Sequence, residues 1–116
     1  MMDQNKPFFV CEEMQKLRDQ LDNHGIEWQD KSEHYDDSNV WICRTWFTHN
    51  NIMWSVVHGF GSYGGIYPGN EDKGLLELMV FDDGGGENPL EENPMGFLTA
   101  DNILKLMGLE KKDDQM

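Results

Sequence analysis

The sequence predicts an α+β domain in which an antiparallel sheet of three to four strands lies between an N-terminal and a C-terminal helix. Three observations predict it: a helical apolar stripe near the start, two β-branched and aromatic runs around Asn50 and Asn51, and a capped helix near the end. The chain has 116 residues, enough for one domain with one modest core. We expect one domain over 1–116, in the order α-β-β-β-β-α, with loose ends at about 1–7 and 110–116.

The first helix is expected from about Phe9 to His24, with Gly25 ending it in a left-handed conformation. A short strand is expected over 26–29, followed by a polar loop over 29–39. The apolar residues of the helix recur at i, i+4, i+7 and i+11, which places them on one face: Val10, Met14, Leu17 and Leu21.

The clearest pattern lies between residues 40 and 60. Two strand-like runs flank Asn50 and Asn51, a pair that tolerates the positive φ of a two-residue hairpin turn. The predicted register pairs His49 with Ile52, Phe47 with Trp54, Thr45 with Val56, Cys43 with His58 and Trp41 with Phe60.

Both faces of this ribbon are apolar, and such a ribbon is not stable alone in water. We expect the helices to pack on the face that holds Trp41, Phe47 and Trp54. The other face would then be covered by a loop, by a second copy of the chain or by a partner protein. Its apolar residues are Val40, Ile42, Trp46, Met53 and Val57.

The second half of the chain predicts one strand and one helix. The run 74–81 is expected to be a strand, with Leu76, Leu78 and Val80 on one face, and 82–96 an acidic surface loop. The last helix is expected to begin after a Thr99 N-cap, to bury Ile103, Leu106 and Met107, and to end at Gly108.

The glycine-rich segment over 58–69 contains a literal G-x-G-x-x-G, formed by Gly59, Gly61 and Gly64. A dinucleotide site needs a helix N-terminus after these glycines, so that its N–H groups face the pyrophosphate. Pro68 and the following glycines exclude such a helix, and nearby Glu71 and Asp72 repel phosphate. The segment is therefore interpreted as a bend after a strand.

Other catalytic and metal patterns are weak. Cys43 and His58 are expected to be cross-strand neighbours, but no third group or oxyanion signal accompanies them. The four histidines lack zinc-site spacing, and the acidic loops do not match a calcium-binding loop. Two cysteines without a C-x-x-C pattern indicate free thiols. We expect a non-enzymatic protein with no metal and no cofactor.

Charge indicates the kind of partner. The chain has 22 acidic and 9 basic residues, a formal net charge of −13 at pH 7. Such a surface repels nucleic acid and anionic lipid, which excludes direct binding to either. The start of the chain has no signal-peptide pattern, and no apolar run is long enough to span a bilayer, so we expect a cytoplasmic protein.

The strings "GIEW", "YGG" and "GLLELM", with the final "LTADNILKLMG", resemble small acidic uncharacterised proteins of phages and prophages. The resemblance implies a phage setting, in which small acidic proteins block host defence nucleases by occupying a nucleic-acid groove. It implies no functional residue. The expected role is an inhibitor or adaptor that binds a basic, nucleic-acid-binding host protein such as a CRISPR effector.

Two sets of candidate site residues follow, together with a possible homodimer through the Val40–Phe60 ribbon. The first set would bind the basic partner through carboxylates and one aromatic anchor; it comprises Glu27, Asp30, Glu33, Asp36, Asp37, Trp46, Glu71, Asp72, Asp82 and Asp83. The second would sequester a nucleotide signal by ring stacking and phosphate pairing; it comprises Arg44, Trp54, Tyr63, Tyr67 and Lys73.

Overall fold

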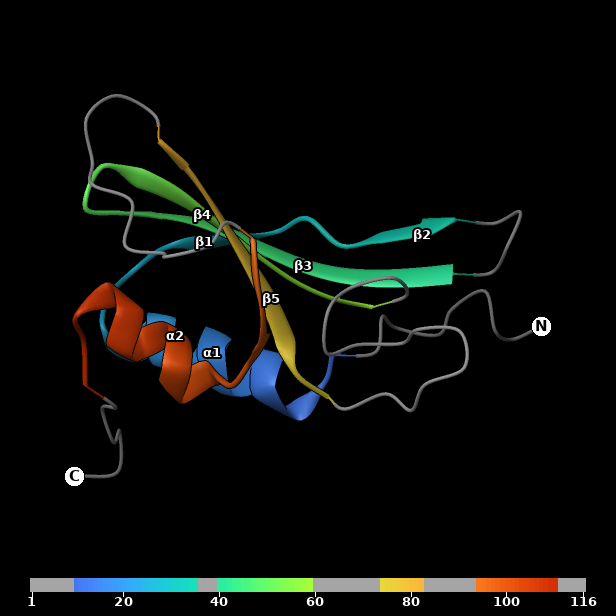
Figure 1. Cartoon of the computed structure of the whole chain (residues 1–116), viewed down its shortest axis with the longest axis horizontal. Helices are drawn as coiled ribbons and strands as arrows, with labels where there is room; N and C mark the ends of the chain where they lie inside the picture. The colour runs from blue at the N-terminus through green and yellow to red at the C-terminus, as the bar shows by residue number, and fades with distance from the viewer. Residues whose placement is uncertain (1–9, 36–39, 60–73, 83–93, 111–116) are drawn as a thin grey trace.

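A computed structural model of the chain describes residues 10–35, 40–59, 74–82 and 94–110. These residues form an α+β fold, with the sheet on one side and both helices packed beneath it (Figure 1). The elements in chain order are α1 (Glu12–Asn23), β1 (Trp28–Asp30), β2 (Glu33–Tyr35), β3 (Val40–His49), β4 (Ile52–Gly59), β5 (Leu76–Asp82), β6 (Met95–Leu98) and α2 (Ala100–Met107).

The sheet is antiparallel and its strands follow the order β1-β3-β4-β5-β6, with β2 also paired to β3. The strands β1 and β2 therefore share one edge of the sheet, and β6 forms the other edge in the described part of the chain. The predicted α+β class and both terminal helices are confirmed. The predicted number of strands was too low, because β2 and β6 lie in segments that we expected to be loops.

The central hairpin has the predicted register. Cys43 lies opposite His58, Phe47 opposite Trp54 and His49 opposite Ile52. Asn50 and Asn51 both have positive φ, at 56° and 65°, as a two-residue hairpin turn of the mirror-image type requires. The expected pairing of Trp41 with Phe60 lies outside the described residues.

Both helices cover the same face of the sheet. Every second residue of β4 is buried from Ile52 onward, and β5 buries Leu76, Leu78 and Val80 as predicted. These side chains join Met14 and Ile103 from the two helices in one core cluster. The face of β3 that bears Phe47 is thus the helix-covered face, in agreement with the sequence-based expectation.

Helix α1 begins later than the predicted Phe9. Its N-cap residue is Cys11, which has extended dihedral angles and makes no side-chain capping bond. The C-terminal end is as predicted: Gly25 has φ of 72°, and the Ile26 N–H donates to the Leu21 carbonyl at 2.8 Å. This hydrogen bond is one of the two that define a Schellman motif, which directs the chain back toward the sheet.

Helix α2 follows its sequence signals closely. The Thr99 hydroxyl accepts from the Asn102 N–H at 3.1 Å, and the Asn102 side chain accepts from the Thr99 N–H at 2.9 Å, which forms a capping box. Gly108 closes the helix with φ of 82°. Ile103 and Met107 are buried, Leu104 joins them in the core, and Leu106 is half-buried.

The two strands that were not predicted are both edge strands with weak patterns. The polar strand β2 pairs Glu33 with Ile42 through its backbone, which needs no apolar alternation. Strand β6 contains a bulge, because two steps along β5, from Leu76 to Leu78, match three steps along β6, from Leu98 to Met95. A bulge disrupts the period-2 pattern by which a strand is predicted.

Candidate protein-binding surface

The face of the sheet opposite the helices keeps a partly exposed apolar surface, which we call the open face. Phe81 is 42% exposed there. The other members lie on β3, β4 and β5 at positions that alternate with the core residues, and all are half-buried. Five are apolar, Ile42, Trp46, Met53, Val57 and Met79, and three are polar, Arg44, Ser55 and Glu77. A sheet face with this many accessible apolar side chains is typical of a contact surface.

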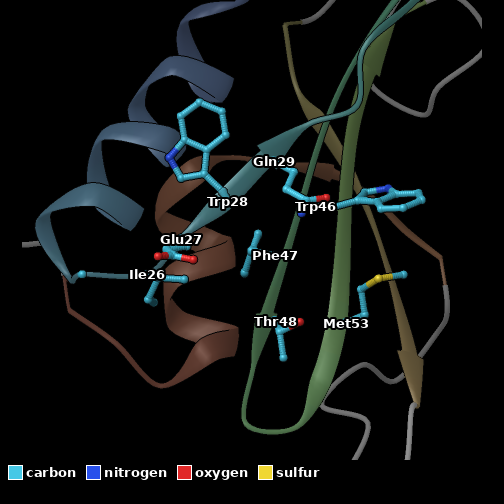
Figure 2. A pocket seen from close by; sticks show the side chains of 9 residues that line it. Ile26, Glu27, Trp28, Gln29, Trp46, Phe47, Thr48 and Met53 are labelled. Atoms are coloured by element: carbon cyan, nitrogen blue, oxygen red, sulfur yellow. The ribbon is translucent and has the colours of Figure 1, made fainter.

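A pocket of about 630 Å³ lies at the sheet edge, where the chain passes from α1 into β1. We call it the edge notch. Figure 2 shows Trp46 and Met53 on one side of the sheet, and Ile26, Glu27 and Trp28 on the side of the helices. Gly25, Gln29, Phe47 and Thr48 complete the lining.

The notch exists because strand pairing ends early. The ladder between β1 and β3 stops at Trp28 opposite Phe47. Thr48 is the next residue of β3, and it has no partner in the described ladder with β1. Thr48 is exposed and lines the pocket, to which it brings oxygen acceptors.

Two indole rings beside the notch each interact with a cation. The Arg18 guanidinium lies over the Trp28 ring, with its Cζ 4.6 Å from the ring centroid. The Lys31 ammonium lies over the Trp46 ring at 5.2 Å. The Trp46 Nε1 atom is buried without a hydrogen-bond partner. Both tryptophans are therefore held in positions where their rings attract positive charge.

The predicted partner-binding carboxylates differ in whether they form ion pairs within the protein. Glu27 is exposed and makes no ion pair within the described residues. Asp30 lies 3.3 Å from an Arg18 nitrogen and accepts from the Ser32 hydroxyl and N–H, at 2.5 Å and 3.0 Å. Glu33 pairs with Arg44 at 3.0 Å.

Trp46 lies on the open face, and Asp82 ends β5 opposite Ile52, two strands away from β3 at the notch edge and beside the β3–β4 turn. The structure thus brings Glu27 and Trp46 together at the notch and places Asp30 and Glu33 along the same edge. Outside the described residues lie Asp36, Asp37, Glu71, Asp72 and Asp83.

The alternative nucleotide-binding set needs correction at one position. Trp54 is 1% exposed, stacks on Phe47 at a centroid distance of 5.9 Å and donates its indole N–H to the His49 carbonyl. It is a core residue and has no free face for a base. Arg44 is held by Glu33. Tyr63, Tyr67 and Lys73, like Gly61 and Gly64, lie outside the described residues.

Cys43 and His58 are cross-strand neighbours, as predicted. Both side chains are buried, and their contacts are those of residues that stabilise the fold. Burial raises the pKa of the Cys43 thiol, and this outweighs the nearby Ser32 hydroxyl and the Arg18 charge. A nucleophilic cysteine needs a lowered pKa. His58 Nδ1 lies 2.9 Å from the Leu75 carbonyl. Nothing in this geometry indicates an activated thiol.

Arg18 of α1 contacts the β1–β3 edge of the sheet, and the sequence pattern did not single it out. It is 6% exposed and lies on the buried face of α1 beside Leu17. A signal was present, since residue 18 falls between Met14 and Leu21 at helical spacing, on the apolar stripe itself. An arginine on such a stripe indicates a buried polar contact.

Within the part of the chain that the structure describes, no group of three or more histidine, cysteine, aspartate or glutamate side chains is arranged to hold a metal ion. No helix there is long and apolar enough to cross a membrane. Comparisons with family models, with curated proteins and with solved structures give no match to this chain.

Proposed function

We propose that this protein is a non-enzymatic inhibitor or adaptor that binds a basic protein through the open face and the adjoining β1–β2 edge. One observation carries the proposal: both helices cover the same face of the sheet, and the opposite face keeps accessible apolar side chains such as Met79 and Phe81. Interfaces commonly combine an apolar centre of this kind with a charged rim.

Charge selects the class of partner. The net charge is −13, and two basic side chains are paired internally, Arg18 of α1 with Asp30 and Arg44 of β3 with Glu33. Glu27 remains exposed and unpaired among the described residues, at the edge where the open face ends. A surface of this sign attracts a basic protein over long distances and orients it during encounter.

The partner that fits best is a cytoplasmic protein whose basic groove normally holds nucleic acid. The resemblance to small acidic phage proteins supports this choice and suggests a defence nuclease, such as a CRISPR effector. In this proposal the protein acts by occupying the groove, and it needs neither a cofactor nor a catalytic residue.

The experiment is capture of the partner followed by quantitative binding. The immobilised full chain is exposed to bacterial lysate at low salt, and each captured protein is purified and titrated against the wild type. We expect the double variant Met79→Ser, Phe81→Ser to bind at least about tenfold more weakly, because the centre of the interface loses its apolar contacts.

The matched control is Glu12→Gln, which removes one charge from an exposed position on α1. It should bind within about twofold of the wild type. The association rate of the wild type should fall steeply as salt rises. The proposal is wrong if no basic protein is captured at low salt, or if the double variant binds as tightly as the wild type.

A further inference from the structure

The edge notch is rich in groups that attract a cation. Its lining includes Glu27, Gln29 and Thr48, which carry oxygen acceptors, and the indoles of Trp28 and Trp46. Among the described residues that line it, none is a lysine or an arginine. Carboxylate, carbonyl and aromatic faces together are the surroundings that proteins use to hold guanidinium and ammonium groups.

The molecule itself demonstrates this preference at both indoles. Arg18 lies over Trp28, and Lys31 lies over Trp46, at 4.6 Å and 5.2 Å from the ring centroids. These contacts fix the two rings before any partner arrives. A pre-formed aromatic wall lowers the entropy that binding must overcome.

Glu27 is the charge that remains available. Asp30 and Glu33, the other carboxylates of this edge, are bound to Arg18 and Arg44. Glu27 makes no corresponding contact within the described residues, although it lines the pocket. This exposed carboxylate, on the same side of the sheet as the Trp28 indole, therefore has its full hydrogen-bonding capacity for an external donor.

We propose that the edge notch receives an arginine side chain of the basic partner. Its guanidinium binds Glu27 and packs against the indole of Trp28 on the same side of the sheet. This inference rests on the proposed function, because the side chain belongs to the same partner. Arginine fits better than lysine, since its planar group both stacks on aromatic faces and pairs with carboxylate through two N–H groups. The volume of about 630 Å³ also leaves room for neighbouring residues of the partner.

The test uses short peptides, so it does not need the partner. N-acetylated, C-amidated Gly-Ser-Arg-Ser-Gly is titrated into the isotopically labelled full chain, followed by amide and indole NMR signals. The same is done with lysine and with citrulline in place of arginine; citrulline keeps the shape but lacks the charge. We expect saturable shifts at Glu27, Trp28 and Thr48 with the arginine peptide, in about the millimolar range.

Three comparisons decide the result. Citrulline should weaken binding at least about tenfold, and Glu27→Gln should do the same for the arginine peptide. Lysine should bind more weakly than arginine. The control Glu12→Gln also replaces a carboxylate by an amide, at an exposed position of α1 away from the notch. It should leave the affinity for the arginine peptide within about twofold of the wild type.

The inference is overturned if citrulline binds as well as arginine, if the shifts avoid the notch, or if Glu12→Gln weakens binding as much as Glu27→Gln. The last outcome would indicate general attraction to a negative surface. Peptide binding at the notch without capture of any basic protein would leave this inference standing and contradict the proposed function. Capture of a basic protein without binding of the arginine peptide at the notch would contradict this inference and leave the proposed function standing.

Discussion

The Nε of Arg18 donates a hydrogen bond of 2.8 Å to the hydroxyl of Thr45, which joins the buried face of α1 to the middle of β3. The same guanidinium donates through Nη2 to the Arg44 carbonyl and to an Asp30 carboxylate oxygen, both at 3.3 Å. Thr45 is fully buried. One side chain thus sets the position of the helix relative to two strands, and it holds the edge on which the notch lies.

We expect Arg18→Ala to lower the free energy of unfolding by about 3 kcal/mol, because the buried Thr45 hydroxyl loses its donor and the Asp30 carboxylate loses its ion-pair partner. Arg18→Lys should also destabilise, by about 1–2 kcal/mol, since an ammonium cannot reproduce the planar fork. Urea denaturation followed by tryptophan fluorescence measures both effects. Lys16→Ala, on the exposed side of α1, should leave the midpoint unchanged. Equal midpoints for Arg18→Ala and the wild type would contradict a structural role for this contact.

Asp30 should make stability depend on acid pH. Partial burial alone would raise the pKa of its carboxyl, but hydrogen bonds from Ser32 and the nearby Arg18 charge outweigh this and hold the pKa below its ordinary value of 3.8. A lowered folded-state pKa contributes stability above the unfolded value, which is lost as pH falls through the folded value. We expect Asp30→Asn to be less stable than the wild type at about pH 6, and this difference to shrink as pH falls toward about 2. A difference that stays constant over this range would contradict the assignment.

The turn between β3 and β4 offers a test of backbone conformation. Asn51 has φ of 65°, where glycine is favoured and β-branched residues are strained. Asn51→Gly should stabilise the protein by about 0.5 kcal/mol, because Asn-Gly is the preferred pair for this turn. Asn51→Val should destabilise it by about 1–2 kcal/mol. Thermal denaturation of the three proteins gives the order, and a valine variant as stable as the wild type would exclude the mirror-image turn.

The elements with strong local chemistry could be predicted from the sequence. The Asn50–Asn51 turn fixed the hairpin register, and Thr99 and Gly108 marked both ends of α2. Strand β2 could not be predicted because its residues are polar and it pairs with the neighbouring strand β3 through the backbone alone. Strand β6 could not be predicted because a bulge interrupts the alternation by which a strand is recognised.

The candidate site could be predicted only in part. Alternation along the ribbon placed Trp46 and Met53 on the face away from the helices. Trp54 was also proposed to stack a ligand, as an aromatic residue near the glycine-rich segment, but it is 1% exposed and belongs to the core. The notch was not predictable, since it arises where β1 leaves β3 at Trp28, a tertiary feature without a local signal.

Strand β6 contains a strained residue. Phe97 has φ of 59° and is 55% exposed, at the bulge that interrupts the pairing with β5. A bulky residue rarely adopts positive φ, and doing so costs about 1–3 kcal/mol. We expect Phe97→Gly to be about 1 kcal/mol more stable than Phe97→Ala, because both lack the ring but only glycine relieves the strain. Chemical denaturation of the pair isolates this term, and an alanine variant that is the more stable of the two would contradict it.

The mass of the protein in solution tests whether the open face is reserved for another protein. We expect a monomer of 13.5 kDa by light scattering at micromolar concentration and low salt, because two copies with net charge −13 repel each other. Trp46→Ser and Phe81→Ser should leave this mass unchanged. A dimer that Phe81→Ser dissociates would assign the open face to a second copy of the chain and contradict the basic partner at that face. A dimer that survives both substitutions would place self-association elsewhere, and the peptide titration at the edge notch would still decide whether Glu27 binds arginine.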